Sequence, residues 1–448
     1  MKRNVELAII GGGTAGLSAL KEAGRSTRDT VLIDPGPLGT TCARVGCMPS
    51  KALLHAARDV AAAREAIDRE HLVDTAIEVD VPAVMAHVQT LRDRFAAVPA
   101  ASVRKLGERY IAGQPRFLDA QTLDVNGEHI QARHIIVATG TRPLIPTAWA
   151  PVSDRILTSD TLFDQADLPG RIAVIGLGPI GLELGQALGM LGLDVHAFGH
   201  GARLGGLQRR TSNTVAKAAL NRHMAIHTGT DVVLQRTDEG VCVHWGEGQT
   251  LTVDRVLAAV GRQPNVEGLG LEALDVPLDR RGLPEIDPRT LRVADLPVFF
   301  AGDVHGLRPL MHEAADEGVI AARQALQGTQ PQERRTPLAI VFTEPGFARV
   351  GVPVADLPSD AVSASFNMAE QGRAILMNRP EGVLHVDADA SGRLLGAELV
   401  APEAEHLGHA LAWLIQQRVT VDEALQLPFY HPVLEEGLRS VLQALRRQ

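Results

Sequence analysis

The amino-acid sequence predicts an α/β protein with three domains. Its 448 residues correspond to about three domains of ~150 residues each. The pattern G-x-G-x-x-G occurs between an apolar strand and a helical segment at two places, 165 residues apart. The C-terminal region lacks this pattern and alternates strand-like with helix-like segments. These observations predict two similar strand–helix–strand domains followed by a smaller α+β domain.

Composition and charge exclude several classes of protein. The apolar fraction is 45% and the charged fraction 22%, which is ordinary for a globular chain. The net charge of −9, with both signs interspersed, gives no electrostatic reason to expect nucleic acid or an anionic membrane as a partner. No segment reaches the ~18 apolar residues of a membrane span, and the apolar run that ends before Gly11 is shorter than the ~7 residues of a signal peptide core. We therefore expect a cytoplasmic protein, in keeping with only three cysteines.

Two strand–glycine–helix–strand units organise the first 200 residues or so. The first consists of a strand, a glycine turn, a helix and a second strand: Val5–Ile10; Gly11, Gly13 and Gly16; a helix from Leu17; and Thr30–Ile33, followed by Asp34. The second has the same order: Ile172–Ile175; Gly176, Gly178 and Gly181; a helix to about Leu191; and Val195–Phe198. Such glycines allow a tight turn and let a pyrophosphate approach the backbone at a helix N-terminus. The two units therefore predict two Rossmann-like dinucleotide sites.

The remaining segments set the expected domain limits. Proline-punctuated stretches at Arg142–Gly170 and Pro264–Pro297 suggest crossings between the first two domains, and Gly328–Pro337 suggests a polar linker. Leu123–Val125 and Glu128–Ile136, joined by Asn126-Gly127, predict a hairpin with a type I′ turn. In the C-terminal region we expect three strands and two helices: Leu338–Phe342, Gly382–Val386, Leu394–Leu399, Glu403–Gln417 and Val433–Leu445.

Cys42 and Cys47 lie directly after the first unit in a glycine-containing run. Buried structural thiols are one interpretation, and a zinc half-site is another, although no second pair of ligands at zinc spacing is evident. A disulfide is the third: five helical residues span about 7.5 Å, more than the usual ~4.4–6.8 Å between bridged Cα atoms, so it needs a distorted turn that Gly46 could permit. Strained disulfides are typically redox-active. Two neighbouring dinucleotide units favour this last interpretation, because together they would form an electron relay.

Further motifs give the sequence a specific resemblance. The most specific is the run C-x₄-C-x-P-S-K from Cys42 to Lys51. Other motifs follow in order along nearly the whole chain: Ala138-Thr139-Gly140, Gly261-Arg262-x-Pro264-Asn265, Ala301-Gly302-Asp303, Glu313–Gly318 and His431-Pro432-x-x-x-Glu436. The chain thus resembles the flavoprotein (pyridine nucleotide) disulfide reductases, and within them a divergent bacterial dihydrolipoamide dehydrogenase.

The resemblance implies FAD in the first unit and a nicotinamide nucleotide in the second. It implies an FAD-binding domain, a nucleotide-binding domain and a dimerisation domain at residues 1–145 with 266–335, 146–265 and 336–448. The residues implied to bind the two cofactors are Gly11, Gly13, Gly16, Asp34, Thr41, Lys51, Ala138, Thr139, Gly140, Gly176, Gly178, Gly181, Gly261, Arg262, Gly302 and Asp303.

The resemblance also implies catalytic roles. Cys47 is expected to be the thiolate next to the flavin and Cys42 the thiol that exchanges with the substrate disulfide. His431 would be the base, supplied by the partner subunit of a homodimer, with Glu436 orienting its ring. Lys51 would lie beside the flavin N5 and pair with Glu183.

Nucleotide choice and substrate are less closely defined. The position that would hold a ribose-binding acid in the second unit is Gly199, and His200 or Arg203 could approach a 2′-phosphate. We expect NAD, with NADP as the alternative. The predicted function is NAD-linked oxidation of dihydrolipoyl groups or the reverse reaction, with a lipoyl carrier protein as a candidate partner.

Two alternatives to this function remain at this point. One is a reductase of another small disulfide, such as glutathione, and the other a non-catalytic flavoprotein subunit of a multienzyme complex. No metal is expected, because His406 and His409 lack an evident third ligand. Cys242, in an alternating segment, is expected to be inert.

Overall fold

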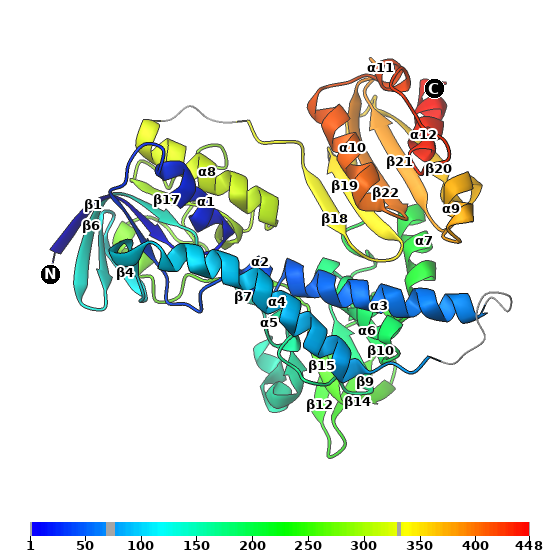
Figure 1. Cartoon of the computed structure of the whole chain (residues 1–448), viewed down its shortest axis with the longest axis horizontal. Coiled ribbons are helices and arrows are strands. Elements are labelled where there is room, and N and C mark those ends of the chain that lie inside the picture. The colour runs from blue at the N-terminus through cyan, green and yellow to red at the C-terminus, as the bar shows by residue number, and fades with distance from the viewer. Residues whose placement is uncertain (1, 69–76, 329–332, 448) are drawn as a thin grey trace.

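The computed structural model describes residues 2–68, 77–328 and 333–447, and three separate main sheets organise the chain (Figure 1). The first sheet has the order β3-β2-β1-β6-β5-β4, with β17 paired to β6. Its strands are β1 (Lys2–Ile10), β2 (Thr30–Ile33), β3 (Tyr110–Ile111), β4 (Pro115–Asp119), β5 (Thr122–Val125), β6 (Glu128–Val137) and β17 (Val298–Phe300). β17, from far along the chain, extends the parallel part of the sheet, so the chain returns to the first domain after completing the second.

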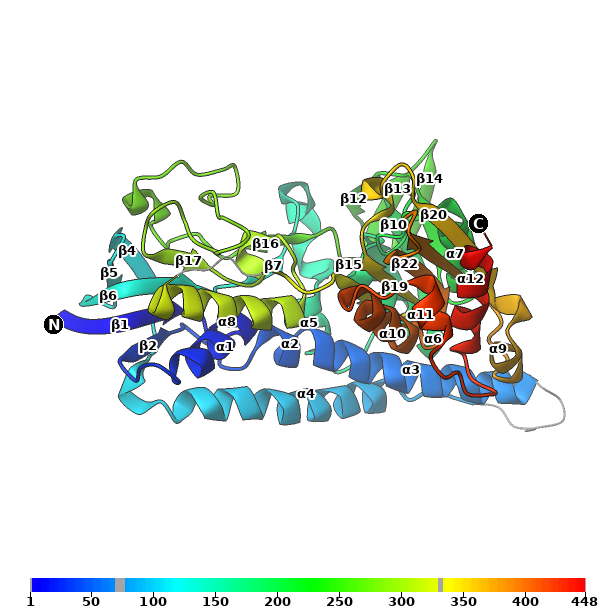
Figure 2. The same ribbon diagram turned by 90° about the horizontal axis from the view of Figure 1, so that it is seen from above.

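Helices cover the first sheet and extend away from it. α1 (Thr14–Ala23) and α8 (Met311–Gln327) pack against each other. After the short α2 (Thr41–Arg44), the long α3 (Cys47–Asp68) and α4 (Val81–Arg104) lie side by side along the length of the molecule (Figure 2). α3 also packs on α6 (Pro179–Leu191) and thereby joins the first two domains.

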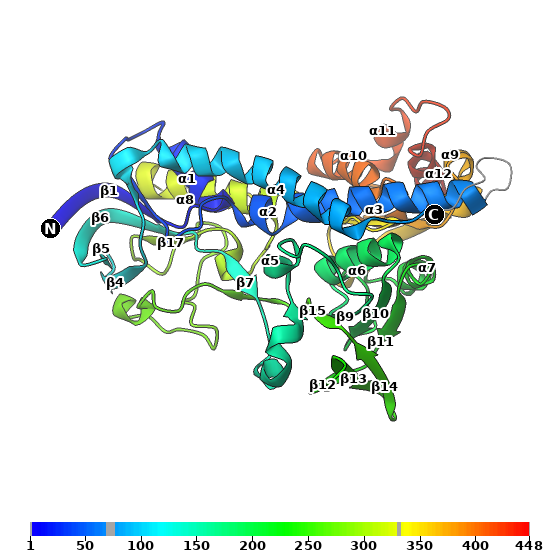
Figure 3. The same cartoon turned by 60° about the horizontal axis from the view of Figure 1, so that its bottom comes forward.

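The second sheet is parallel throughout, with the order β11-β10-β9-β15-β8. Its strands are β8 (Ile156–Leu157), β9 (Arg171–Ile175), β10 (Asp194–Gly199), β11 (Ala225–Thr228) and β15 (Arg255–Ala258). An antiparallel sheet of β12 (Val232–Arg236), β13 (Val241–Trp245) and β14 (Gln249–Val253) lies at the outer end of this domain (Figure 3). The short antiparallel pair β7 (Thr141–Pro143) and β16 (Arg262–Pro264) joins the two crossings between the first and second domains.

The C-terminal sheet is antiparallel and has the order β18-β19-β22-β21-β20. Its strands are β18 (Leu338–Val341), β19 (Gly346–Gly351), β20 (Val362–Asn367), β21 (Val383–Ala388) and β22 (Leu394–Ala401). The helices of this region are α9 (Gly372–Leu376), α10 (Ala404–Gln416), α11 (Val421–Leu425) and α12 (Glu436–Arg446). The shorter helices elsewhere are α5 (Ser159–Leu162) and α7 (Arg210–Leu220). Among the described helices, none is long and apolar enough to cross a membrane.

The predicted fold class is confirmed, and so is the hairpin. Asn126 and Gly127 both have positive φ, 54° and 82°, as a type I′ turn requires. The sequence analysis missed β19, β20 and the long α3 and α4. The predicted helix at Val433–Leu445 begins instead at Glu436, whose carboxylate accepts a hydrogen bond from the Val433 N–H just before the helix. The predicted linker Gly328–Pro337 includes residues 329–332, which lie outside the described residues.

Candidate active site

The first glycine turn forms an open cradle at the start of α1. A Cβ on Gly11, which has φ +104°, would lie 2.3 Å from the Ala138 carbonyl oxygen, and one on Gly16 would lie 1.9 Å from the Gly11 oxygen. Gly13, in contrast, has no heavy atom within 4 Å of its Cβ position. Two glycines therefore allow the backbone to close, and the third leaves space where a pyrophosphate would meet the helix N-terminus.

Asp34 lies directly beside this cradle. Its two carboxylate oxygens accept hydrogen bonds from the backbone N–H groups of Gly12, at 2.5 Å, and Gly36, at 2.6 Å. The side chain is thus fixed at the end of β2, the place where a ribose-binding acid lies in a Rossmann unit.

The second glycine turn repeats the same geometry. A Cβ on Gly176 would lie 2.1 Å from the Ala259 oxygen, one on Gly181 would lie 1.9 Å from the Gly176 oxygen, and Gly178 is open. This domain therefore also fits a dinucleotide. At the end of β10, the exposed His200 Nδ1 lies 2.7 Å from Asp231 Oδ1, a carboxylate that follows β11.

The two cysteines are separated by a break between two helices. α2 contains Cys42 and ends at Arg44, and α3 begins at Cys47. A Cβ on Gly46 would lie 3.0 Å from the Thr41 oxygen and 3.2 Å from Cys42 Cα, so this close turn favours glycine. Both cysteines are free thiols, and their side chains hydrogen-bond to each other. The helix is thus interrupted between the two cysteines, as a disulfide between them would require.

The two thiols are electrostatically unequal. The hydrogen bond from Cys42 lowers the pKa of Cys47 to about 7, against the opposing effect of burial, and the ammonium of Lys51 lowers it further. The same hydrogen bond, together with burial, raises the pKa of Cys42. Of the two thiols, Cys47 is therefore the one that loses its proton more readily.

Lys51 lies one helical turn after Cys47 and joins three segments. Its Nζ lies 2.7 Å from Glu183 Oε2 on α6 and 4.6 Å from the ring centroid of Phe342, just after β18. The Lys51–Glu183 pair is the one that the resemblance implied. The sequence analysis placed Phe342 at the end of a predicted strand but did not connect it with this site, because no motif marks a single aromatic residue there.

A buried network fixes the segment that carries Asp303. Glu317 Oε2 accepts hydrogen bonds from the Gly302 N–H and from His305 Nε2, each at 2.7 Å, and Glu317 Oε1 contacts Arg334 at 2.6 Å. Burial raises the pKa of Asp303, although Arg262 opposes this effect.

His431 and Glu436 form a pair near the C-terminus. His431 Nδ1 lies 3.0 Å from Glu436 Oε1, and this hydrogen bond is the main cause that lowers the pKa of Glu436. The His431 side chain is 81% exposed. α12, which begins at Glu436, lies far from α2 in both Figures 1 and 2, so this chain does not bring the pair to its own Cys42.

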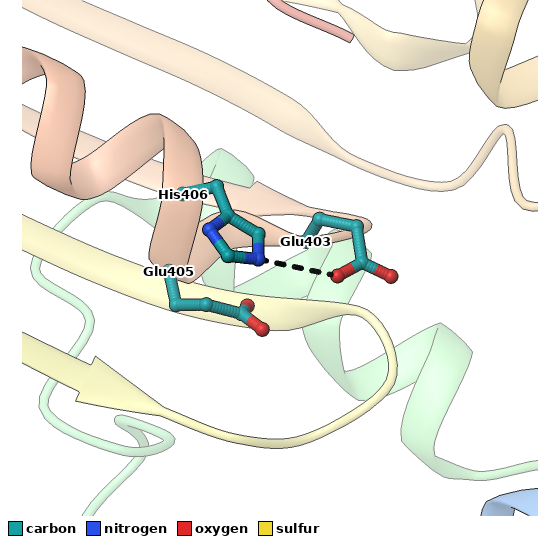
Figure 4. Close-up of side chains that lie close together, drawn as sticks. All are labelled: Glu403, Glu405 and His406. Carbon is teal, nitrogen blue, oxygen red and sulfur yellow. Dashed lines mark ion pairs between the residues drawn. The ribbon is translucent and has the colours of Figure 1, made fainter.

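His406 has acidic neighbours that the sequence analysis did not consider. It lies with Glu403 and Glu405 in a surface group whose ligand atoms are within 4.8 Å of one another (Figure 4). His409 Nδ1 instead lies 2.7 Å from the Glu405 backbone oxygen. These side chains are remote from the thiol pair in sequence, and exposed acidic groups of this kind are common without a metal ion.

Two open glycine turns and two thiols of unequal pKa are typical of an oxidoreductase that binds dinucleotides and transfers electrons to or from thiols. Comparison with known protein families gives the same class. The family model described as pyridine nucleotide-disulphide oxidoreductase matches residues 5–318, and its dimerisation domain matches residues 338–442. The chain belongs to this enzyme family, whose cofactors are FAD and NAD(H).

Similar proteins span the whole chain. A dihydrolipoyl dehydrogenase of Pseudomonas aeruginosa is 30% identical, over 98% of this chain and 97% of the relative. The solved structure of LpdA from Mycobacterium tuberculosis is 28% identical, covers 98% of this chain and 100% of its own, and has a TM-score of 0.85. A copper(II) complex of the HOCl-induced flavoprotein disulfide reductase RclA from Escherichia coli has a TM-score of 0.86, covering 99% and 100% of the two chains. Because RclA is 23% identical, this likeness shows the fold alone.

Proposed function

We propose that this enzyme is an NAD-linked dihydrolipoamide dehydrogenase that exchanges electrons with a dithiol substrate. The observation that carries the proposal is the unequal thiol pair, in which Cys47 has a pKa of about 7 and Cys42 remains protonated. The similarity to several proteins named dihydrolipoyl dehydrogenase supports this substrate class.

The residues of this site have separate roles in electron transfer, thiol exchange and cofactor binding. The flavin, when bound, would supply two-electron transfer between the nucleotide and the thiols. Cys47, next to Lys51, is the thiolate that faces it, and Cys42 is the thiol that exchanges with substrate. The glycines of the two cradles, with Asp34 and Asp303, would hold the dinucleotides. Residues 1–145 with 266–335 form the FAD-binding domain in this proposal, residues 146–265 the NAD-binding domain, and residues 336–448 the dimerisation domain.

Each active site combines two subunits in this proposal. His431 is exposed and lies on an element remote from α2, and residues 338–442 match a dimerisation domain. His431 therefore acts as the base at Cys42 of the partner copy, and Glu436 fixes the Nδ1 side of its ring. The second alternative, a non-catalytic subunit, is disfavoured by the complete thiol pair and its paired histidine.

We further propose that NAD is the preferred nucleotide because Asp231 supplies an acid. Gly199 lacks a side chain, but the Asp231 carboxylate lies 2.7 Å from the adjacent His200 ring. At the end of β10, a carboxylate can accept a hydrogen bond from a ribose hydroxyl and repels a 2′-phosphate.

The substrate proposal is tested by steady-state kinetics with FAD-loaded enzyme. We expect kcat/KM for lipoamide with NADH to exceed that for glutathione disulfide with NADH or NADPH by at least about tenfold, because substrate contacts discriminate by a few kcal/mol. The Cys42→Ser variant is the control for turnover through the thiol pair. A preference for glutathione would favour the small-disulfide alternative.

A further inference from the structure

We infer that Phe342, the first residue after β18, is a positioning residue that holds the Lys51 ammonium between Glu183 and Cys47. The inference rests on the proposed role of the Cys47 thiolate. It adds a residue from the C-terminal domain to a site otherwise formed by α3 and α6.

Phe342 contacts both members of the ion pair. Its ring centroid lies 4.6 Å from Lys51 Nζ, within the range of a cation–π interaction. Its backbone N–H donates a hydrogen bond of 2.8 Å to Glu183 Oε1, while Glu183 Oε2 is 2.7 Å from Lys51 Nζ. The two carboxylate oxygens are thus used separately, one for Phe342 and one for Lys51.

The turn that carries Phe342 is itself held rigidly. Gln186, one turn after Glu183 on α6, exchanges two hydrogen bonds with the backbone of Glu344, at 2.7 Å and 2.8 Å. Arg58 on α3 donates to the carbonyl oxygens of Phe342 and Thr343. The same two helices that present Lys51 and Glu183 therefore fix the Phe342 backbone.

This arrangement has a consequence for Cys47. The Lys51 side chain is still 34% exposed, and a lysine stem is flexible, so one ion pair leaves it several conformations. The Phe342 ring and the Glu183 carboxylate together restrict the ammonium to the position from which it stabilises the thiolate. Without the ring, Lys51 would spend less time there and the thiolate would form less readily.

The test measures ionisation of Cys47 in the FAD-loaded protein reduced by two electrons, through the long-wavelength charge-transfer absorbance of a thiolate beside oxidised flavin. This absorbance is titrated with pH for Phe342→Leu, which keeps the backbone N–H and removes the ring. We expect the ionisation constant of Cys47 to fall about two- to fivefold, the size of a partly exposed cation–π interaction. Phe342→Tyr, which retains a ring, should restore the wild-type ionisation constant.

Three further variants separate positioning of Lys51 from a general loss of structure. Phe347→Leu removes a buried ring from the adjacent strand, and its Cys47 should keep the wild-type ionisation constant. Phe342→Met keeps the side-chain volume and replaces Phe342→Leu if that variant unfolds. In a Lys51→Met background, Phe342→Leu should have no additional effect. Additive effects, or a wild-type ionisation constant in both ring-free variants, would overturn the inference. Because the readout needs no dithiol turnover, it remains informative if the substrate proposal fails.

Discussion

Cys42 and Cys47 have different environments although only four residues separate them. Each contacts the other, and the Lys51 ammonium, one helical turn after Cys47, acts to lower the pKa of both thiols. The hydrogen bond between the two thiols has the larger effect: it stabilises the charge on Cys47 and the proton on Cys42.

This asymmetry predicts a pH profile. Above about pH 7 Cys47 is ionised, and below it the thiolate fraction falls about tenfold per pH unit. We expect the long-wavelength charge-transfer absorbance of the reduced, FAD-loaded protein to follow this profile, because it reports a Cys47 thiolate beside the flavin. Absorbance spectra at several pH values measure it. Cys242→Ala should leave the profile unchanged, and a Cys47→Ser variant that kept the band would contradict the assignment.

A second residue-scale prediction concerns nucleotide choice. Asp231→Ala removes the carboxylate next to His200 and should raise kcat/KM for NADPH relative to NADH by about fivefold at low salt, as exposed charges interact weakly and are screened. Asp238→Ala, an exposed acid in the β12–β13 turn, is the matched control. An unchanged ratio in Asp231→Ala would remove this residue from nucleotide selection.

At the scale of elements, α3 explains the spacing of the thiol motif. Cys47 begins the helix, where the N-terminal partial charge favours an anion, and Lys51 follows at i+4 on the same face. The proline between them, Pro49, lies in the first turn, where its missing N–H costs little. The spacing Cys-x-x-x-Lys therefore places a thiolate and its cation together through one turn of helix.

The glycine turns allow a sharp contrast between two variants. Gly16→Ala would force its Cβ against the Gly11 oxygen, at 1.9 Å, and should prevent the turn from closing, with low yield of folded protein. Gly13→Ala has open space and should fold, but with FAD affinity reduced about tenfold or more because the methyl group occupies the pyrophosphate approach. Thermal unfolding and FAD titration of the apoprotein distinguish the two outcomes. Tight FAD binding by Gly13→Ala would contradict the assigned cradle.

At the scale of the whole molecule, hydrogen bonds and an ion pair connect the second domain to the C-terminal sheet. The buried Glu398 on β22 accepts hydrogen bonds from the backbone N–H groups of Gln208 and Arg209, just before α7. The Arg209 guanidinium also pairs with the buried Asp387 on β21. These contacts satisfy charges that would be costly to bury alone, so they fix the nucleotide domain on the domain assigned to dimerisation.

A homodimer with shared sites predicts complementation between inactive variants. Cys42→Ser and His431→Ala should each have little activity as homodimers. A purified heterodimer of the two contains one site with both wild-type residues and should show about half of the wild-type activity, since a two-fold dimer has two equivalent sites. Co-expression with two different tags allows this measurement. If both residues acted within one chain, the heterodimer would stay inactive.

The sequence was informative wherever function depends on neighbouring residues. Gly11, Gly13 and Gly16 act through one turn, and the Cys42–Lys51 run acts through two short helical segments, so spacing alone indicated their chemistry. Lys51 and Glu183 were connected only through the family resemblance, because 132 residues separate them. Phe342 and Asp231 were missed as functional residues because no local pattern marks them.

By itself, the sequence determined the two dinucleotide units, the thiol pair and the family, since strand–turn–helix periodicity and tight turns are local properties of the chain. The tertiary structure alone decided that the β18–β19 turn reaches Lys51, that an acid approaches His200, and that Glu398 meets α7. Those contacts join residues that are distant in the sequence, and they exist only after packing of helices and sheets has brought the segments together.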